Sequence, residues 1–598
     1  MATDSETFVK AADADELREE GRLLVRADGR SIALFHHEGE YRAVDNRCPH
    51  MGFPLTDGTV EDGILTCHWH HARFELSCGD TFDPWADDVQ SFPVEERDGE
   101  VYVNPHPEPD EPPEEHWRNR LETGLEENLR LVVAKSAIGL ANEGVPAEEP
   151  LRVGARFGAR YRQQGWSSGL TIHSAMANVL PDLRPEDRTR ALYTGLHHVA
   201  DDCQGEPPKF DQPSFDTRDV TEERLRKWFR DCVEVRDDDG AERCLQTAIA
   251  TLEPETVADI LYTAATDHLY LDAGHSFDFI NKALEMVDRV GWEHAHEILP
   301  SVIPRLTNAQ RSEELSSWTQ PADLGELLFD AFDDLPAMVD EGQAAADDAT
   351  DWTEPDDFVD TLLSDDPHAV LDALTDAVRA GASCEQLADR VAYASALRVA
   401  QFGTSNEFND WNTVHHTYTY NNAVQQAARR ASSTALYRGV LAGAMSVYLD
   451  RFLNTPPAPI PEVEESDADS ADLRDRLLET FDEEGGVREA ATLVAEHFAA
   501  GGDPADLKET LGEGLLREDA GFHTLQNLEA SFAQFDLRSD DEASDFVSTD
   551  RERERRVVLM ALARYMAAHF PTRREAEQTY TIADRLHRGE KIHESDGV

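Results

Sequence analysis

The stretch CPHMGFPLTDGTVEDGILTCHWH, residues 48–70, decides how this chain is interpreted, because it holds two Cys-plus-His pairs. Cys48 pairs with His50 and Cys67 pairs with His70, and sixteen residues separate His50 from Cys67. A [2Fe-2S] cluster in which one iron takes two thiolates and the other takes two neutral imidazoles needs one ligand of each kind from each of two loops. The intervening chain is long enough to leave one loop, form a strand and return beside it. The pattern therefore predicts such a cluster, and with it single-electron transfer.

The residues that follow extend this pattern beyond the four ligands. The sequence CPHMGFPLTDGTVEDGILTCHWHHARFELSCGDTFDPWADDVQSFPVEERDGEVYV resembles the Rieske ferredoxin and Rieske oxygenase ferredoxin-domain family, and the resemblance covers residues 7–104. It implies that Cys48 and Cys67 hold the inner iron and that His50 and His70 hold the solvent-facing iron. The alternative is a zinc site, since zinc accepts the same ligands. Zinc fingers rarely carry Cys-x-His and Cys-x-x-His pairs between glycine-rich β-type segments, so we favour the cluster.

Four residues near the ligands bear on the redox potential. High-potential Rieske proteins of respiratory complexes carry a Ser and a Tyr after the second loop His, and a disulfide between the two loops. Here the hydroxyl positions are Ala72 and Phe74, and the disulfide positions are Phe53 and Trp69. Because hydrogen bonds to the sulfurs stabilise the reduced cluster, their absence predicts a low potential, around or somewhat below roughly −100 mV. This favours a donor to a downstream enzyme over a quinol-oxidising subunit.

The chain is expected to be an α+β multidomain protein in three parts. Residues 1–104 contain short β-type runs separated by Asp-Gly turns, which predict a small all-β domain with the cluster at its tip. Residues 105–116 are rich in Pro and Glu and predict an extended linker. Residues 117–598 show apolar side chains at three- to four-residue spacing, which predicts a large α-helical domain. The β-type runs are Arg22–Val25, Ile32–Phe35, Tyr41–Val44, Ile64–Thr66 and Val101–Val103.

The helical region shows a weak internal repeat of helix pairs. A helix that ends in a glycine turn occurs near Gly144, Gly381 and Gly501, and each is followed by a second helix and a His-led segment. This pattern predicts stacked helix pairs, each covering the apolar face of its neighbour. The stacking is interrupted by predicted flexible loops at residues 205–216, 455–471 and 538–550.

The His-led segments supply the candidate site residues of this region. They begin at His173, His416 and His523, and a fourth copy places His275 at the same point. Residues at equivalent points of stacked units can converge on one groove; the alternative is that each His bonds the neighbouring backbone. The segments GLTIHSAMANVL, DWNTVHHTYTYNNAVQQA and GASCEQL resemble questin oxidase-like proteins, helical enzymes that oxygenate polyketide-derived rings. That resemblance implies that His173, His275 and His416 line a substrate cavity and are catalytic.

Two common non-haem iron arrangements are not predicted in the helical region. The mononuclear type pairs an acid with a His-x4-His spacing on a large sheet, but His268 and His275 are seven apart and no sheet is expected. A di-iron bundle needs Glu-x-x-His motifs on two helices, and a match such as the one ending at His296 is within chance for so acidic a chain.

Charge limits the classes of partner. Asp and Glu number 120 against 55 Lys and Arg, giving a net charge of −65. An acid excess spread along the whole chain is typical of adaptation to molar intracellular salt, which screens self-repulsion. Nucleic acid is not expected as a ligand, because no basic face is visible. The acidic N-terminus, the absence of a long apolar run and the scattered cysteines favour a cytoplasmic protein without a membrane span.

Two hypotheses for the function remain open. The first is an oxidoreductase in which the cluster passes electrons to a reaction site in the helical domain, where a second iron or a small organic substrate binds. The second is an electron carrier or redox sensor whose helical repeats bind a partner protein. No Gly-x-Gly-x-x-Gly loop follows a predicted strand, so a separate reductase is expected to supply the electrons.

Visible absorption and EPR spectra distinguish the cluster from zinc. After anaerobic reconstitution with iron and sulfide, we expect a coloured protein with an EPR signal in the reduced state, because the mixed ligand set binds a [2Fe-2S] cluster. A colourless, EPR-silent protein would mean that the four ligands hold zinc.

Overall fold

The computed structural model divides the chain into two compact units. The N-terminal unit is Met1–Pro146 together with Gln578–Val598, and the helical unit is Ala147–Glu577. We expected the boundary in the segment 105–116, whereas the units separate between Pro146 and Ala147. The structure describes residues 7–109, 111–216, 220–347, 352–538, 550–590 and 592.

Short antiparallel strands form the first part of the N-terminal unit. In its described residues they make three three-stranded sheets, with orders β1-β9-β8, β2-β3-β4 and β5-β6-β7. The five β-type runs all lie within these strands. The elements are β1 (Val9–Asp13), α1 (Ala14–Glu20), β2 (Arg22–Ala27), β3 (Arg30–His37), β4 (Glu40–Asp45), β5 (Thr59–Glu61), β6 (Ile64–Thr66), β7 (Arg73–Glu75), β8 (Val94–Arg97) and β9 (Glu100–Val103).

Three of the four Asp-Gly pairs turn the chain between adjacent strands. Asp28, Asp62 and Asp98 have φ angles of 45°, 50° and 51°, and each is followed by a glycine with positive φ. Two left-handed residues in sequence match the twist of an antiparallel hairpin. The fourth pair differs, because Asp57 ends a 3-10 turn and Gly58 has a φ of −74°.

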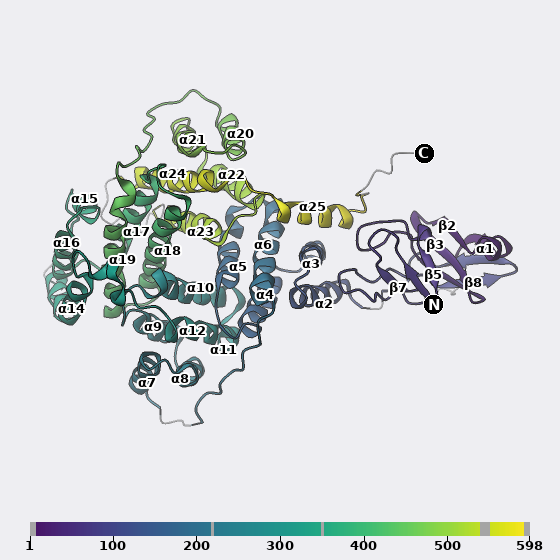
Figure 1. The fold of residues 1–598 in the computed structure, drawn as a ribbon, viewed down its shortest axis with the longest axis horizontal. Helices are drawn as coiled ribbons and strands as arrows, with labels where there is room; N and C mark the ends of the chain where they lie inside the picture. The colour runs from purple at the N-terminus through teal and green to yellow at the C-terminus, as the bar shows by residue number, and fades with distance from the viewer. Residues whose placement is uncertain are drawn as a thin grey trace. The chain divides into compact units, whose positions relative to one another are not determined.

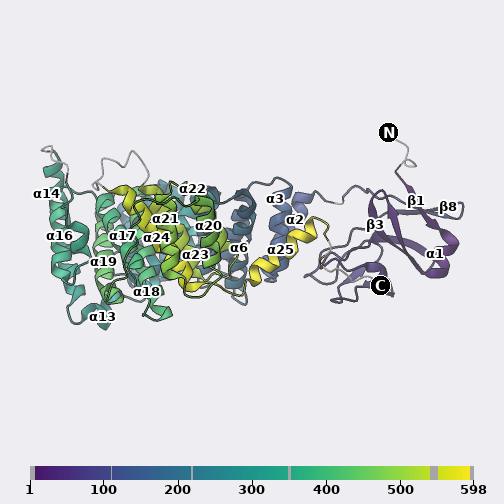
Figure 2. The ribbon, with the colours of Figure 1, turned by 90° about the horizontal axis from the view of Figure 1, so that it is seen from above.

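Three helices complete the N-terminal unit: α2 (Pro113–Glu126), α3 (Arg130–Asn142) and the end of α25 (Glu575–His587). The last four residues of the predicted linker are therefore helical. Proline is tolerated in the first turn of a helix, where its missing N–H has no partner to lose. Trp117 of α2 and His587 of α25 place their ring centroids 5.7 Å apart. Figure 2 shows α25, in yellow, beside α2 and α3.

Four helices lie in the middle of the helical unit (Figure 1). They are α5 (Ser168–Val179), α10 (His275–Val290), α18 (Phe408–Arg430) and α23 (Phe522–Leu537). Helix α10 packs against α5 and α18, and α23 packs against the same two helices. Each of the four carries one of the repeat-borne histidines.

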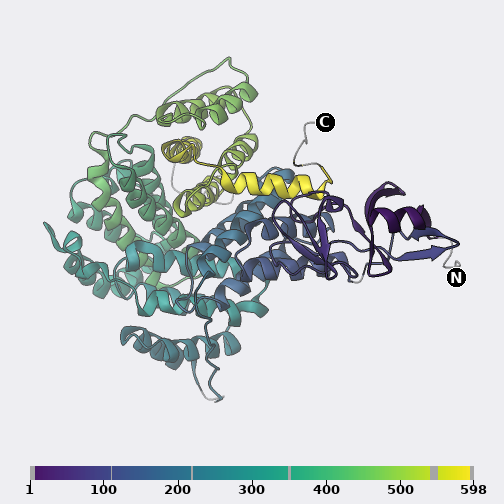
Figure 3. The same cartoon turned by 45° about the vertical axis from the view of Figure 1, so that its right-hand side comes forward.

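The other α-helices surround these four, and Figure 3 gives a second view of them. They are α4 (Glu148–Arg160), α6 (Pro185–Cys203), α7 (Glu222–Glu234), α8 (Asp238–Thr251), α9 (Pro254–Ala265), α11 (Ala295–Ile298), α12 (Ile303–Thr307), α13 (Ser316–Thr319), α14 (Leu324–Asp347), α15 (Phe358–Leu362), α16 (Pro367–Arg379), α17 (Cys384–Ala400), α19 (Thr434–Leu449), α20 (Ser470–Thr480), α21 (Val487–Ala499), α22 (Pro504–Leu516) and α24 (Arg551–His569).

The segments predicted as loops are described only in part. Residues 205–216 contain no helix or strand, and the second segment is irregular until α20 begins at Ser470. Most of the third, residues 539–549, lies outside the described residues. Among the helices that the structure describes, none is both long enough and apolar enough to cross a bilayer.

Candidate cluster site and candidate metal centre

The first ligand loop follows β4 and is closed by two backbone hydrogen bonds. The N–H of Cys48 donates to the carbonyl oxygen of Phe53 at 2.8 Å, and the N–H of Gly52 donates back to the carbonyl oxygen of Cys48 at 2.7 Å. Gly52 has a φ of 81°, in the left-handed region that glycine adopts without strain. This closure holds His50 near the apex of the loop.

The second ligand loop follows β6 and repeats the same closure. The N–H of Cys67 donates to the carbonyl oxygen of Ala72 at 2.8 Å, and the N–H of His71 donates to the carbonyl oxygen of Cys67 at 3.0 Å. His71 takes the left-handed position, with a φ of 64°. The two loops are thus built alike, and each presents one thiol and one imidazole.

The four predicted ligands lie together at the ends of these loops. Cys48 and Cys67 are 2% and 1% exposed, and their thiols lie within hydrogen-bonding distance of each other. The rings of His50 and His70 are 4.8 Å apart, centroid to centroid. The Nδ1 atom of His50 is buried and has no hydrogen-bond partner, as expected of an atom that binds a metal. Two buried thiols beside two imidazoles fit a [2Fe-2S] cluster with mixed ligands.

Electrostatics near the first loop favours the neutral form of His50. Burial, and secondarily the charge of Lys135, lower the pKa of its imidazole to about 4. Iron requires an unprotonated ring nitrogen, so a neutral His50 suits the ligand role.

Comparison with known proteins agrees with this geometry. The family model for the Rieske [2Fe-2S] domain matches residues 7–93. The ferredoxin component of naphthalene 1,2-dioxygenase/salicylate 5-hydroxylase systems from Ralstonia sp is 32% identical over 91 residues, which are 15% of this chain and 88% of that protein. The chain belongs to the Rieske [2Fe-2S] domain family.

Two further matches of this Rieske protein cover the same region. The ferredoxin subunit of 3-phenylpropionate/cinnamic acid dioxygenase from Photorhabdus laumondii is 39% identical over 74 residues, 12% of this chain and 70% of that subunit. A solved complex of reduced oxygenase and oxidized ferredoxin in carbazole 1,9a-dioxygenase is 22% identical, covers 17% of this chain and 98% of that chain, and has a TM-score of 0.17.

The Rieske cluster site lacks hydroxyl groups at two positions that matter for the potential. Ala72 and Phe74 are fully buried apolar residues, so neither offers a hydrogen bond to a cluster sulfur. At the positions expected for a disulfide, the rings of Phe53 and Trp69 lie 6.3 Å apart. An aromatic contact therefore connects the two loops where a covalent clamp would stand.

A buried lysine from α3 holds the first ligand loop of the Rieske domain. Lys135 is 5% exposed, and its Nζ donates to the carbonyl oxygens of Pro49 and, at 3.3 Å, His50. The same Nζ lies 3.7 Å from the carboxylate of Asp87. Burial lowers the pKa of the Lys135 amine, and the charge of Asp87 opposes this. A cation is thus placed directly behind two consecutive residues of the ligand loop.

Helices α2 and α25 add further contacts near this loop. Arg120 of α2 pairs with Asp87 and donates to the carbonyl oxygen of Ala86 at 3.0 Å. Arg47, next to the first ligand, donates to the carbonyl oxygens of Leu586, at 3.1 Å, and of Glu590. Helices α3 and α25 therefore contact the first ligand loop or its flank, and α2 contacts residues near it.

In the helical unit, three of the repeat-borne histidines come together. His275 is the first residue of α10, His416 lies in α18, and His523 is the second residue of α23. One ring nitrogen from each lies within 4.8 Å of the other two, and the Nε2 atoms of His416 and His523 are 2.7 Å apart. The three side chains are half-buried, and together they are a candidate metal centre.

Burial lowers the pKa values of these three imidazoles. The pKa falls to about 4 for His416 and to about 3 for His523, and it falls well below the usual range for His275. Neutral imidazole is the form that binds metal ions. Imidazole ligands suit zinc, copper, iron and nickel, so three of them define a transition-metal site.

His173 lies apart from this cluster. Its Nε2 is 2.9 Å from the carbonyl oxygen of Leu151, and its ring fills the space beside Gly154 of α4 and Gly195 of α6. A Cβ added at either glycine would come within 2.7 Å of a ring nitrogen. We expected His173 to converge on one groove with the other three histidines, but in the structure it is packed in the core.

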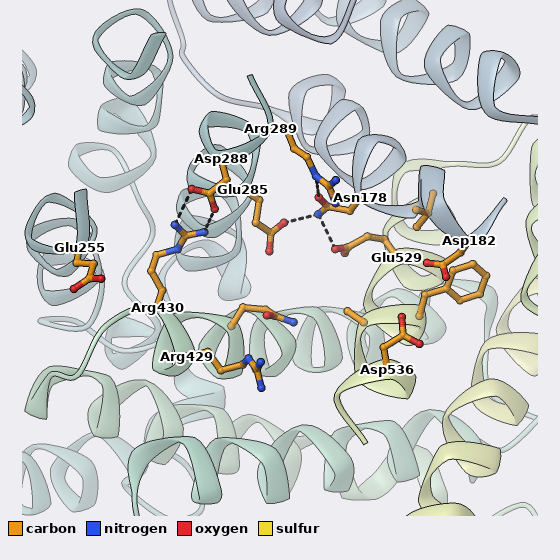
Figure 4. Close-up of a pocket in the computed structure, with 14 residues that line it drawn as sticks. Asn178, Asp182, Glu255, Glu285, Asp288, Arg289, Arg429, Arg430, Glu529 and Asp536 are labelled. Atoms are coloured by element: carbon orange, nitrogen blue, oxygen red, sulfur yellow. Dashed lines mark hydrogen bonds and ion pairs between the residues drawn. The ribbon is translucent and has the colours of Figure 1, made fainter. Parts of the chain in front are cut away.

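A cavity of about 440 Å³ adjoins the three-histidine cluster. His416 forms part of its wall, together with Tyr270 and Trp318, and Asp450 lies in it as well. A second cavity, of about 770 Å³, has a charged lining that includes Glu285, and Figure 4 shows it. Of these two cavities, only the first is lined by one of the three histidines.

The other histidines considered from the sequence have protein partners. His268 lies 2.7 Å from a carboxylate oxygen of both Glu313 and Glu234. His294 lies 3.3 Å from Glu297, and His296 lies 2.8 Å from the carbonyl oxygen of Glu293. Among the described residues, neither His268 nor the pair His294 and His296 belongs to a group of side chains close enough together to bind one metal ion.

Two residues of these sites were missed in the sequence. Lys135 is one of only seven lysines, and it lies inside the apolar run LVVAKSAIGL. A single charged residue in an apolar helix segment could have identified it as a candidate. Asp450 directly follows the apolar helix α19, but one acid among 120 acids gives no signal.

Replacing Lys135 tests its electrostatic role. In the full chain, Lys135→Met removes a buried positive charge beside the ligand loop and should lower the midpoint potential of the cluster. We expect roughly a tenfold change in the reduction equilibrium, which is about 59 mV for a one-electron couple. The measurement is an EPR-monitored redox titration.

The matched control is Lys10→Met, because Lys10 is an exposed lysine of the same unit, paired with Glu100. Lys10→Met should leave the midpoint potential unchanged. Equal potentials for Lys135→Met and the unmodified chain would contradict the role given to Lys135.

Proposed function

We propose that this protein is a Rieske iron–sulfur oxidoreductase that passes single electrons from its cluster to a metal centre in its own helical unit. The observation that carries the proposal is the convergence of His275, His416 and His523 from three different helices. The relatives described above are named as the ferredoxin component of dioxygenase/hydroxylase systems and the ferredoxin subunit of a dioxygenase. Here a large helical unit belongs to the same chain, so the acceptor is placed within it.

Cys48, Cys67, His50 and His70 hold the cluster in this proposal. When bound, a [2Fe-2S] cluster there supplies reversible one-electron transfer. The buried cysteines keep water from the sulfurs, while the exposed His70 offers an edge to a redox partner.

The three-histidine centre is proposed as an iron site for oxygenase-like chemistry. Three imidazoles leave further coordination positions open, which an oxidation reaction needs for its reactants. Among the metals that imidazole binds, iron and copper change oxidation state by single electrons, which matches a one-electron donor, and of the two we propose iron. His275 and His416 thus act as ligands in this proposal, His523 completes the set, and His173 supports packing.

The partners in this proposal are a separate reductase that loads the cluster, and a small organic substrate. The questin oxidase likeness is consistent with such a substrate. We also propose, from the net charge of −65, that the protein works in a cytoplasm of molar salt.

The alternative function is an electron carrier or redox sensor without catalysis. The separation of 2.7 Å between His416 Nε2 and His523 Nε2 favours it in one respect, because one neutral imidazole can donate a hydrogen bond to another at this distance. In that case the helical unit would bind a partner protein.

Metal analysis distinguishes the two functions. After anaerobic loading with iron, the full chain should contain about three irons, two in the cluster and one at the histidines. The double variant His416→Ala/His523→Ala should contain about two irons and keep the EPR spectrum of the reduced cluster, because its ligands lie elsewhere. The matched control is His294→Ala, which replaces a histidine outside the three-histidine cluster and should keep about three.

Two irons in the unmodified chain would contradict the enzyme proposal. Zinc bound firmly at the histidines in place of iron would contradict it as well, because zinc has no redox chemistry.

A further inference from the structure

We infer that the cavity beside His416 is a binding site for a mainly apolar organic molecule that donates one hydrogen bond, from a hydroxyl or N–H group, to Asp450. This inference rests on the proposed function, since it identifies the substrate site of the three-histidine centre. It goes beyond that function in naming the recognising group and the chemistry it selects.

The walls of the cavity are largely apolar. Leu315, Trp318, Leu324 and Tyr448 contribute to them, and the volume of about 440 Å³ is within the range of small-molecule sites. The cation at the edge, Arg451, is already engaged: its guanidinium carbon lies 3.9 Å from the centroid of the Tyr448 ring, and its NH1 donates to the Tyr448 carbonyl oxygen at 3.0 Å. An anionic ligand therefore has no unengaged cation here.

Asp450 is the carboxylate of this lining. It is 5% exposed, and its Oδ2 atom is buried without a hydrogen-bond partner. Its interactions include a hydrogen bond with Thr417, the charge of Arg398 and an electrostatic interaction with Tyr270. A buried carboxylate oxygen without a donor costs free energy, and a ligand that supplies the donor recovers it. Burial also raises the pKa of Asp450 to about 7.

The cavity and the metal centre share a strained piece of backbone. Tyr270, Asp272 and Ala273 have φ angles of 43°, 49° and 55°, and His275 follows two residues later. Tyr270 and Ala273 line the cavity. Left-handed backbone at residues other than glycine is unfavourable and is concentrated at functional sites. This segment lets one short turn form the cavity wall and position a metal ligand.

The segment is held in place by hydrogen bonds to residues beyond α12. The N–H of Asp272 donates to the carbonyl oxygen of Gln310 at 3.0 Å, and the Ser312 hydroxyl donates to the carbonyl oxygen of Tyr270 at 2.9 Å. Asp450 and His416 line the same cavity, so a molecule bound to Asp450 shares that cavity with a ligand of the proposed metal.

Two probes that differ in one hydroxyl group test the inference on the full chain. Naphthalene has no hydrogen-bond donor and 2-naphthol has one, and equilibrium dialysis at about pH 8.5, above the pKa of about 7 of Asp450, gives the dissociation constant of each with the carboxylate ionised. We expect the chain to bind 2-naphthol at least about tenfold more tightly than naphthalene, the usual effect of a hydrogen bond to a charged group. Asp450→Leu should remove this preference and leave naphthalene binding in place.

Asp376→Leu is the matched control, because Asp376 is an exposed acid on α16 of the same unit. It should keep the preference for 2-naphthol. Asp450→Asn is a second variant that keeps the shape of the side chain, in case the leucine variant does not fold. It should reduce the preference, because a neutral acceptor replaces a charged one.

Equal binding of the two probes to the unmodified chain, no binding of either, or a preference that survives both Asp450 substitutions would overturn the inference. The iron content of the same samples separates it from the proposed function. A third iron without the preference rejects the cavity and leaves the metal centre in place. The preference without a third iron supports the cavity as a binding site and rejects the metal centre.

Discussion

The need for two thiolates and two neutral imidazoles at one point is the constraint on which the N-terminal unit depends. No single turn of chain can supply all four groups, so two loops must present them with the same geometry. The chain meets this need with two loops closed by equivalent hydrogen bonds, from the N–H of Cys48 to Phe53 and from the N–H of Cys67 to Ala72. The β-sheets supply the ends from which both loops project, and helices α3 and α25 support the first loop through Lys135 and Arg47.

The helical unit also brings imidazole side chains together, but it does so with helices instead of loops. Four central helices each carry one of the histidines considered from the sequence, but the local surroundings decide which imidazoles meet. Glycines at positions 154 and 195 leave room for the ring of His173 between α4 and α6, and its Nε2 reaches a backbone carbonyl there. The left-handed turn before His275 starts α10 where its first side chain faces His416 and His523. Two glycines thus explain why His173 is packed in the core, and one strained turn explains how His275 meets His416 and His523.

Local patterns in the sequence predicted much of this architecture. Short β-type runs and Asp-Gly pairs predicted the strands of the N-terminal unit, and the Cys and His spacing predicted the ligand loops. Apolar spacing predicted the helices beyond. The start of α2 at Pro113 was missed, because a run of prolines favours extended chain and only its last member fits the first turn of a helix. The contacts of Lys135 and Asp450 depend on residues far away in the sequence, so spacing alone could not show them.

The central claim is that electrons leave the cluster through the three-histidine centre, and rapid mixing tests it most directly. The chain, loaded with iron and reduced under anaerobic conditions, is mixed with dioxygen, and reoxidation of the cluster is followed by visible absorbance. The account predicts that reoxidation slows markedly in His416→Ala/His523→Ala, although the cluster spectrum and midpoint potential stay unchanged. Equal reoxidation rates in the two proteins would contradict it.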